Sequence, residues 1–500
     1  MSSGAIWRAR SSYILAAFER LIGSRASFTG HLAINLTGSV LARLITLASM
    51  VAITRLYAAT DYGQWVVVLS LASFIVPLAT MRYDIGVVIA PTRHMAAALV
   101  LAIAAGALAT AFVSAAIALI APPSVVRMVS GLTEGQQKLI LLVPLVLLLL
   151  TTQTVLQAWM TRERKFAAMS LSQMLQALVT AAVTILLPFV AGASAGAAAT
   201  GAIVGLVCGL FVCVWASSRN LIALIGSNPA AAAVDAMRHF KVYPLYMLPY
   251  SLSIGILERV TQLILASAYS TGALGTFYVA RQITMGAANI VCAALGQVMF
   301  AHSAREERCL EIKSRTDRLL TFLIDAEAPA LAFCLVWLPS ILNLLMGSRW
   351  TGLSDFAWWN LFPASTLFLV GWLHRILDVL GRQRLAVGLQ AASDAFLVLV
   401  AAVCPLAGLD ATGFVAALSI AISLFDIIWL AIVLRLLQFA PSEIMRLAAR
   451  AVVLLVFWSA AQGAVRVALS AQLGPFLGAL LLALALALLA RKRGVYLEDN

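Results

Sequence analysis

The strongest constraint on this chain is a succession of apolar runs, most of them about 20 residues long and joined by short loops. A helix of that length crosses the hydrocarbon core of a bilayer, and one buried core cannot contain so many runs. Hydrophobic residues make up 62% of the chain and charged residues 11%, whereas an ordinary soluble protein has about 45–50% and about 25%. The sequence therefore predicts an all-α polytopic membrane protein.

The apolar runs divide the chain into fourteen expected crossings. They are 30–56, 64–81, 95–121, 138–159, 167–190, 197–217, 242–268, 277–300, 319–345, 357–379, 385–406, 412–434, 450–470 and 474–490. The predicted organisation is an N-terminal segment (1–29), a first six-helix set (30–217), an inner loop (218–241), a second six-helix set (242–435), two additional helices (436–490) and a tail (491–500). The N-terminal segment reads either as an amphipathic helix on the membrane surface or as a disordered tail.

The Lys and Arg residues predict the orientation of the crossings. With the N-terminus in the cytoplasm, the outer loops hold only Arg127, Lys138 and Arg349, while the inner loops hold most of the remaining basic residues. Cytoplasmic loops of membrane proteins carry such an excess, so both termini are expected in the cytoplasm. This asymmetry explains the net charge of +13 without a nucleic-acid partner.

A short motif recurs between the two halves of the chain. Tyr57 is followed by five residues and Gly63, then by one residue and an aromatic ring; Tyr269 and Gly275 repeat this pattern at an offset of 212 residues. Each copy opens a six-helix set of the same orientation. The offset therefore predicts a parallel repeat, with the substrate site between the halves.

Charged residues in the centre of apolar runs are the candidate site residues. Arg43 lies in the middle of the first predicted crossing, Glu258 and Arg259 in the seventh, and Arg281 about one turn inside the eighth. A charge at that depth is costly, so it normally faces a partner or a polar cavity. A guanidinium offers a donor fork that fits phosphate oxygens, so converging arginines would suit a phosphate or diphosphate. Alternatively, each arginine pairs with a buried carboxylate and fixes helix packing.

Buried carboxylates raise the question of ion coupling. Asp394 and Asp426 fall within the eleventh and twelfth predicted crossings. Such groups can bind Na⁺ or carry protons, which would couple transport to an ion gradient. They can equally serve as structural partners of the arginines. We expect no other cofactor, no metal site among the scattered histidines, and no enzyme activity, because catalytic and nucleotide-binding motifs are not found.

Four further charges are expected near the membrane surface. Asp325 and Glu327 come near the start of the ninth predicted crossing and are expected at the interface. Arg82 and Asp84 end the second crossing, where they could pair locally or line the mouth of a cavity.

Five stretches spread over both halves carry a resemblance to a known family, over roughly residues 28 to 440. The stretches are TRLYAATDYGQW (54–65), LATMRYDIGVVIA (78–90), ALGTFYVARQ (273–282), LLMGSRWTGL (344–353) and VLGRQRLAVGLQ (379–390). With them the chain resembles bacterial polysaccharide and O-antigen flippases, a branch of the multidrug/oligosaccharidyl-lipid/polysaccharide exporter superfamily.

The resemblance implies two pseudo-symmetric six-helix bundles around a central cavity, with two C-terminal helices added. It implies translocation of an undecaprenyl-diphosphate-linked oligosaccharide across the bacterial inner membrane, with a glycan polymerase and a chain-length regulator as partners. Arg43, Arg82, Arg259 and Arg281 would line the cavity, and Glu258, Asp394 and Asp426 lie on the helices that hold a sodium site in related flippases. The alternatives are a drug/cation antiporter of the same superfamily, which would favour an acidic cavity, and a membrane glycan polymerase or ligase.

Overall fold

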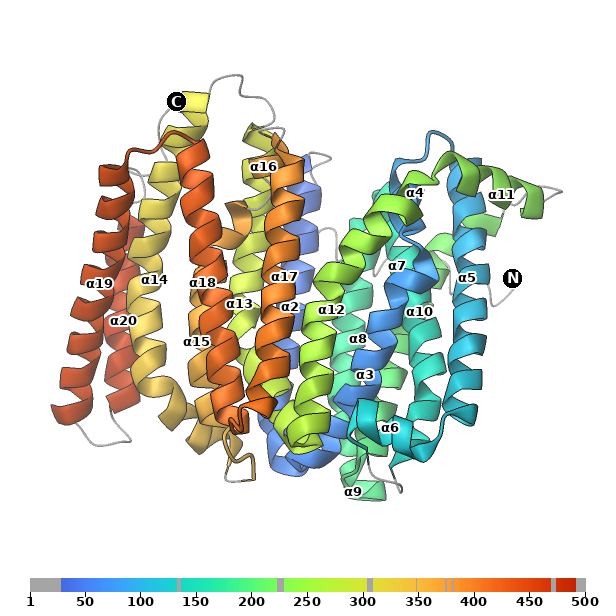
Figure 1. The fold of residues 1–500 in the computed structure, drawn as a ribbon, viewed down its shortest axis with the longest axis horizontal. Coiled ribbons are helices and arrows are strands. Elements are labelled where there is room, and N and C mark those ends of the chain that lie inside the picture. Colours follow the sequence, from blue (N-terminus) through green and yellow to red (C-terminus); the bar gives the residue numbers. More distant parts are fainter. Residues whose placement is uncertain are drawn as a thin grey trace, which may run out of the picture. The chain divides into compact units, whose positions relative to one another are not determined.

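The computed structural model describes residues 28–132, 136–222, 229–303, 309–347, 349–373, 376–379, 382–468 and 474–491. The predicted surface helix within 1–27 and the tail beyond 491 lie outside these residues. Contacts divide the chain into two compact units, residues 1–275 and 276–500. The prediction of an all-helical chain is confirmed, since every regular element in the described ranges is a helix (Figure 1).

In the described residues of the first unit, ten α-helices precede its last long helix. They are α2 (Phe28–Leu56), α3 (Ala59–Thr80), α4 (Tyr83–Ile89), α5 (Arg93–Ile120), α6 (Pro123–Ser130), α7 (Val143–Arg162), α8 (Phe166–Leu186), α9 (Pro188–Ala191), α10 (Ala195–Ile222) and α11 (Pro229–His239), and the last is α12 (Leu248–Ile264). A 3₁₀ turn, Gln137–Leu142, leads into α7. Two π turns, Tyr243–Met247 and Leu265–Tyr269, extend α12 at both ends into one helical run.

The described residues of the second unit form helices α13 to α20. They are α13 (Thr271–Ser303), whose first turn belongs to the first unit, α14 (Cys309–Met346), α15 (Leu353–Val370), α16 (Ile376–Val379), α17 (Gln383–Leu406), α18 (Ala411–Leu436), α19 (Pro441–Ala468) and α20 (Gly474–Arg491). A 3₁₀ turn, Gly371–Leu373, ends α15.

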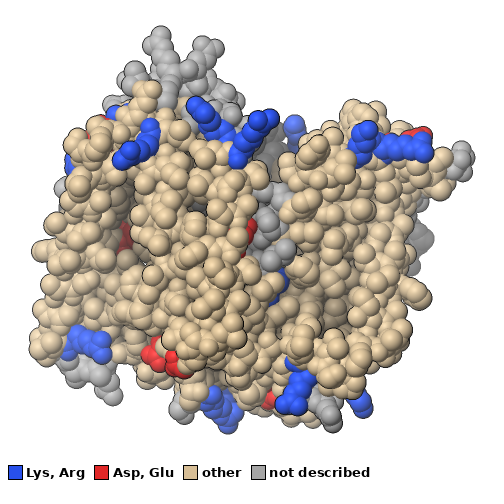
Figure 2. All heavy atoms as spheres, in the orientation of Figure 1, with Lys and Arg blue, Asp and Glu red and all other residues tan. Residues whose placement is uncertain are grey.

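Eleven helical spans in the described residues are long and apolar enough to cross a membrane, and Gly474–Leu489 is a shorter apolar helix. In the view of Figure 2, the described Lys and Arg side chains of each unit lie mostly near the helix ends, with a largely uncharged band between them. This distribution fits helices that span a hydrocarbon layer. Eleven spans and one shorter apolar helix account for twelve of the fourteen expected crossings. Helices α12 and α13 lie at the positions of the expected seventh and eighth crossings.

Glycines bring two helices of the first unit into close contact. Gly201, Gly205 and Gly209 recur every four residues on α10, and a Cβ at each would meet α8 within 3.0 Å. Residues four apart share one face of a helix. This stripe lets the backbones of α8 and α10 approach closely, which is the usual way that membrane helices gain packing energy.

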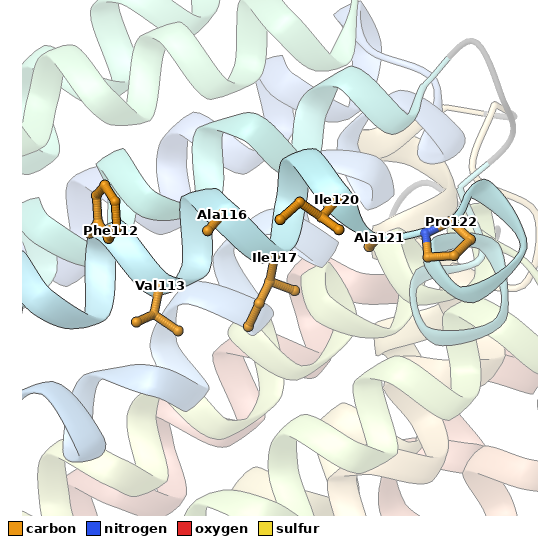
Figure 3. Close-up of a pocket in the computed structure, with 7 residues that line it drawn as sticks. All are labelled: Phe112, Val113, Ala116, Ile117, Ile120, Ala121 and Pro122. Atoms are coloured by element: carbon orange, nitrogen blue, oxygen red, sulfur yellow. The ribbon is translucent and has the colours of Figure 1, made fainter.

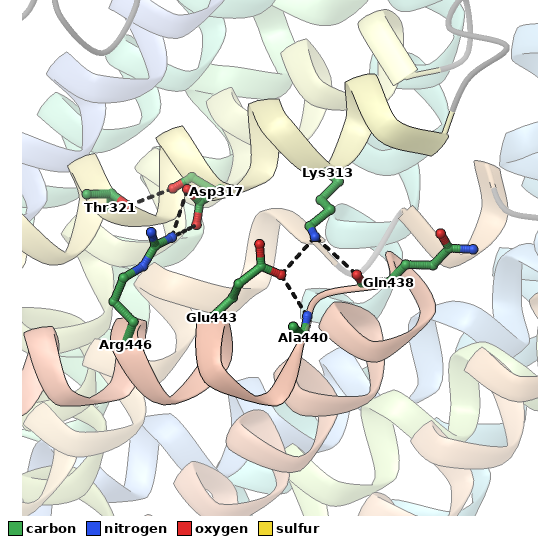
Figure 4. A network of polar contacts seen from close by, with 7 residues as sticks. All are labelled: Lys313, Asp317, Thr321, Gln438, Ala440, Glu443 and Arg446. Atoms are coloured by element: carbon green, nitrogen blue, oxygen red, sulfur yellow. Dashed lines mark hydrogen bonds and ion pairs between the residues drawn. The ribbon is translucent and has the colours of Figure 1, made fainter.

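The N-terminal part of α14 corrects the sequence prediction. The sequence predicts crossings at 277–300 and 319–345, which leaves 301–318 as a loop between them, but α14 begins at Cys309. Ion pairs with α19 explain this extension (Figure 4): Lys313 Nζ lies 2.7 Å from Glu443 Oε2, and Arg446 Nη2 lies 2.9 Å from Asp317 Oδ1. The polar residues that suggested a loop therefore hold two helices together.

The C-terminal helices pack on α14 through one large side chain. Trp337 is almost fully buried and its Nε1 donates a hydrogen bond of 2.9 Å to Gln462 Oε1 of α19. A Cβ at Gly478 of α20 would lie 2.5 Å from the same indole nitrogen. Small residues on α20 thus make room for the Trp337 ring, so α14, α19 and α20 form one packed group.

Candidate functional site

The repeated turn motif forms a tight contact within the first unit. A Cβ built on Gly63 would lie 3.0 Å from the Gly275 nitrogen, and one built on Gly275 would lie 2.9 Å from the Gly63 nitrogen. Each glycine also faces the carbonyl of the residue four positions before the other, Thr271 and Ala59. These positions are themselves 212 residues apart, so the two copies of the motif meet in a locally two-fold arrangement.

The tyrosine that begins the first copy of the motif holds the turn between α2 and α3 in place. Tyr57 is fully buried and its hydroxyl donates a hydrogen bond of 2.8 Å to the Thr184 carbonyl of α8. Burial raises the pKa of Tyr57 from 10.0 to about 12. The turn between α2 and α3 is therefore fixed to the end of α8.

Arg259 is held by an amide rather than by an acid. Its Nη1 donates to Gln262 Oε1 at 3.1 Å, one turn further along α12. The same oxygen accepts a hydrogen bond of 2.5 Å from Ser70, which lies at the middle of α3. Ser70 and Gln262 are both buried. In the described residues no carboxylate pairs with Arg259, so its charge is oriented without being neutralised.

Arg43 and Arg82 occupy different settings. Arg43 is partly buried at the middle of α2, and Ser39, one turn earlier, donates to Gln173 of α8 at 2.8 Å. Arg82 sits in the break between α3 and α4 with a φ of 58°, and its Nη1 lies 3.6 Å from Asp84. The local pairing of Arg82 is the first of the two alternatives that the sequence left open. A common cavity for Arg43 and Arg259 stays a prediction.

Arg281 lies on α13 in the second unit. It is partly buried, and its guanidinium lies 5.9 Å from the centre of the Phe277 ring one turn earlier. This is a cation–π contact within one helix, at the outer limit of the distance for such contacts.

The three acids proposed for coupling fall in three environments. Glu258 is exposed on α12 of the first unit. Asp394 is buried on α17 and accepts a hydrogen bond of 2.9 Å from Gln390 one turn earlier. Asp426 of α18 accepts a hydrogen bond of 2.6 Å from Thr366 of α15. The two acids of the second unit thus have different partners, one along its own helix and one across to a neighbour.

Sequence reasoning overlooked Ser70, Gln262 and Thr366, and it placed Glu327 at the membrane surface. In the structure Glu327 is central in α14 and both of its carboxylate oxygens are buried. Polar side chains in otherwise apolar crossings are the signal that could have found all four, because such groups are retained where they bond across helices.

Two surface pockets lie at the ends of α5 and α6. One of about 370 Å³ is lined only by apolar groups (Figure 3): Phe112, Val113, Ala116, Ile117, Ile120, Ala121 and Pro122. Its exposed side chains belong to a predicted membrane span, so it suits acyl chains and not a polar headgroup. The other, of about 470 Å³, includes Arg127 and Gln137 beside α6.

A comparison with known protein families shows which family this chain belongs to. A profile of the family described as polysaccharide biosynthesis protein matches residues 52–355. The chain belongs to this family. The matched range includes both copies of the turn motif, the Arg259–Gln262–Ser70 contact and all of α14. A search of curated protein sequences found no match.

Two solved structures show the same fold as this polysaccharide biosynthesis protein. The lipid II flippase MurJ in an inward closed conformation is 10% identical with a TM-score of 0.71, covering 92% of this chain and 98% of its own. A multidrug resistance MATE family transporter of the MOP superfamily, in an inward-facing conformation, is 14% identical with a TM-score of 0.56, covering 88% and 98%. The chain is therefore a multi-pass membrane protein with a MurJ- and MATE-like fold.

Proposed function

We propose that this protein is a flippase that moves undecaprenyl-diphosphate-linked oligosaccharides across the bacterial inner membrane by alternating access. The cargo would be repeat units of O-antigen, capsule or exopolysaccharide. Membership of the polysaccharide biosynthesis family and the fold shared with a lipid II flippase support this proposal. A sugar headgroup with a diphosphate cannot cross hydrocarbon, so it needs a hydrated cationic path while the lipid tail stays in the bilayer.

The observation that carries the proposal is the setting of Arg259. A guanidinium in a membrane helix normally pairs with an acid when its role is structural. Arg259 instead donates to the Gln262 amide, and the described residues hold no carboxylate against it. Its positive charge and remaining donors are available to an anionic group, and a diphosphate matches that donor fork.

The remaining arginines complete the proposed diphosphate path. Arg43, Arg82 and Arg281 would contact the diphosphate or the sugars at different stages of transport. Arg43 lies at the centre of α2, and Arg281 lies on α13 one turn after Phe277. Arg82 would act at the mouth of the path, where its pairing with Asp84 is loose at 3.6 Å.

Transport would draw on an ion gradient through buried acids. Asp394 and Asp426, with Glu258, would bind Na⁺ or H⁺ and link its movement to the conformational change. In this proposal both termini are cytoplasmic, and a glycan polymerase and a chain-length regulator use the delivered repeat units on the far side.

A deletion strain tests the proposed activity. Loss of the protein should leave lipid-linked repeat units on the cytoplasmic face and reduce the surface glycan, both of which can be quantified after radiolabelling of the lipid carrier. Complementation with the wild-type gene should reverse both effects. Normal surface glycan in a deletion strain that carries no second flippase gene would contradict the proposal.

A drug/cation antiporter is the second candidate, favoured by the acids in the second unit. Asp426 and Glu327 lie in membrane-spanning helices, and acidic groups suit a cationic substrate. This alternative predicts that the deletion strain becomes sensitive to cationic drugs while its glycan remains intact. The two candidates therefore give opposite results in the same strain.

A further inference from the structure

Glu327 is a buried acid to which the proposed transport cycle assigns no role. It lies at the centre of α14, a helix of 38 residues, about 27 Å from either end at 1.5 Å per residue. Both carboxylate oxygens are shielded from solvent, and neither receives a hydrogen bond of normal geometry from the described residues. Buried polar groups in native proteins are almost always satisfied, so this side chain requires an explanation.

The groups around Glu327 come from three other helices of the second unit. The Ser365 hydroxyl of α15 lies beside its carboxylate, and the neighbouring Thr366 hydroxyl donates to Asp426 of α18 at 2.6 Å. The Cys292 thiol of α13 lies within electrostatic range of both Glu327 and Asp426. Two acids and two hydroxyls thus gather in one interior region where α13, α14, α15 and α18 meet.

The charged groups on the packed helices do not neutralise these acids. Arg450 of α19 is engaged by Asp325 through two hydrogen bonds of 2.7 and 2.6 Å. Helix α20 contributes no titratable side chain between residues 474 and 489. The described lysines and arginines form no ion pair with Glu327 or Asp426. An ionised carboxylate in a low-dielectric interior without a counter-charge is strongly unfavourable.

We propose that Glu327 and Asp426 form the two sides of a binding site for a small monovalent cation, Na⁺ or a proton. The carboxylates supply the charge, and the Ser365 and Thr366 hydroxyls supply oxygen ligands or proton partners. Asp426 is the residue that this site shares with the acids proposed above for ion coupling.

This site deepens the transport proposal, since a cation bound here would be the coupling ion, but it is tested without the lipid-linked substrate. The purified protein is compared in Na⁺ and in N-methylglucamine at constant pH by thermal unfolding. A ligand that binds only the folded state raises the melting temperature. In parallel, infrared difference spectra between acid and alkaline pH report protonated carboxyl groups. Failure here leaves the flippase proposal intact.

The predicted result depends on the occupant. If Na⁺ occupies the site, Na⁺ raises the melting temperature of the wild type, and Glu327→Gln and Asp426→Asn weaken the apparent Na⁺ affinity by at least about 10-fold. If a proton occupies it, Na⁺ has no effect, and the protonated-carboxyl band of the wild type is reduced in Glu327→Gln. Asp317→Asn, at the end of the same helix and paired with Arg446, is the control that keeps the wild-type response.

Thr366→Val removes one hydroxyl and keeps both acids, so it covers the case in which Glu327→Gln does not fold. It should weaken the Na⁺ response or shift the carboxyl band of Asp426. A wild type with neither response, or responses in Glu327→Gln and Thr366→Val equal to those of the wild type, would overturn the proposal.

Discussion

Gly63 and Gly275 pack against each other, and each occupies the same place in its copy of the repeated turn motif. The added Cβ of either residue would come within 3.0 Å of the other glycine's backbone nitrogen. The helices α3 and α13 can start this close together only because both positions lack a side chain.

Alanine at either glycine should destabilise the protein. The obstructing atoms belong to the backbone, so the helix ends must separate, and overpacking of this kind costs about 1–3 kcal/mol. Thermal unfolding in detergent measures the effect. Gly255→Ala is the matched control in the same unit, since a Cβ there meets no atom within 4 Å. Equal melting temperatures for Gly63→Ala and Gly255→Ala would show that the close contact between Gly63 and Gly275 does not contribute to stability.

Gln262 should be needed for transport because it orients Arg259. Gln262→Ala removes the acceptor of both Arg259 and Ser70, and losing a buried hydrogen-bond partner costs about 1–3 kcal/mol. We expect about 10-fold slower transport from the displaced guanidinium. Ser70→Ala leaves the Arg259 contact in place and should have a smaller effect. If Ser70→Ala impairs transport as strongly, packing between α3 and α12 is the cause.

The ion pairs between α14 and α19 should differ in strength. Asp325 is 8% exposed and bonds Arg450 twice, whereas Asp317, paired with Arg446, is 32% exposed. Arg450→Met removes two charge-assisted hydrogen bonds from a buried carboxylate and should cost up to about 3 kcal/mol. Arg446→Met breaks a solvated pair and should cost at most about 1 kcal/mol. Chemical unfolding of the two variants compares them directly, and an equal loss would contradict this ranking.

Tyr57 gives a prediction for alkaline pH. Its pKa rises from 10.0 to about 12 in the folded protein, because the neutral phenol is buried. Its contribution to stability is complete below pH 10 and is lost as the pH rises towards 12. Tyr57→Phe should therefore cost about 1 kcal/mol at neutral pH, and the difference from the wild type should shrink above pH 10. A constant difference across this range would mean that Tyr57 ionises normally.

The sequence was sufficient for the fold class and for finding the two turn motifs, because both depend on local patterns, whereas the parallel repeat of two six-helix sets stays a prediction. Apolar runs of membrane-spanning length indicate helices directly, and the paired Tyr and Gly positions mark equivalent turns. That Gly63 contacts Gly275 could not be predicted in this way, since it depends on how distant helices pack.

Glu327 shows where local reasoning failed. The charged residues before 319 suggested a loop, which placed Glu327 near a membrane surface. In the structure Lys313 and Asp317 pair with α19, so α14 starts earlier and Glu327 lies at its centre. The start of α14 therefore depends on residues of α19 that lie more than a hundred positions away in the sequence. The same holds for Arg259, whose amide partner becomes informative only when Ser70 is seen to share it.

The most direct test of the flippase proposal is transport by purified protein in liposomes. A fluorescent undecaprenyl-diphosphate-linked oligosaccharide is placed in the bilayer, and a membrane-impermeant quencher reports which leaflet holds its headgroup. We predict that the wild type exchanges the headgroup between leaflets and that Arg259→Ala, inserted to the same level, does not. Arg259→Lys keeps the charge without the fork and should be intermediate. Equal exchange by Arg259→Ala and the wild type, or none by a folded wild type, would contradict the proposal.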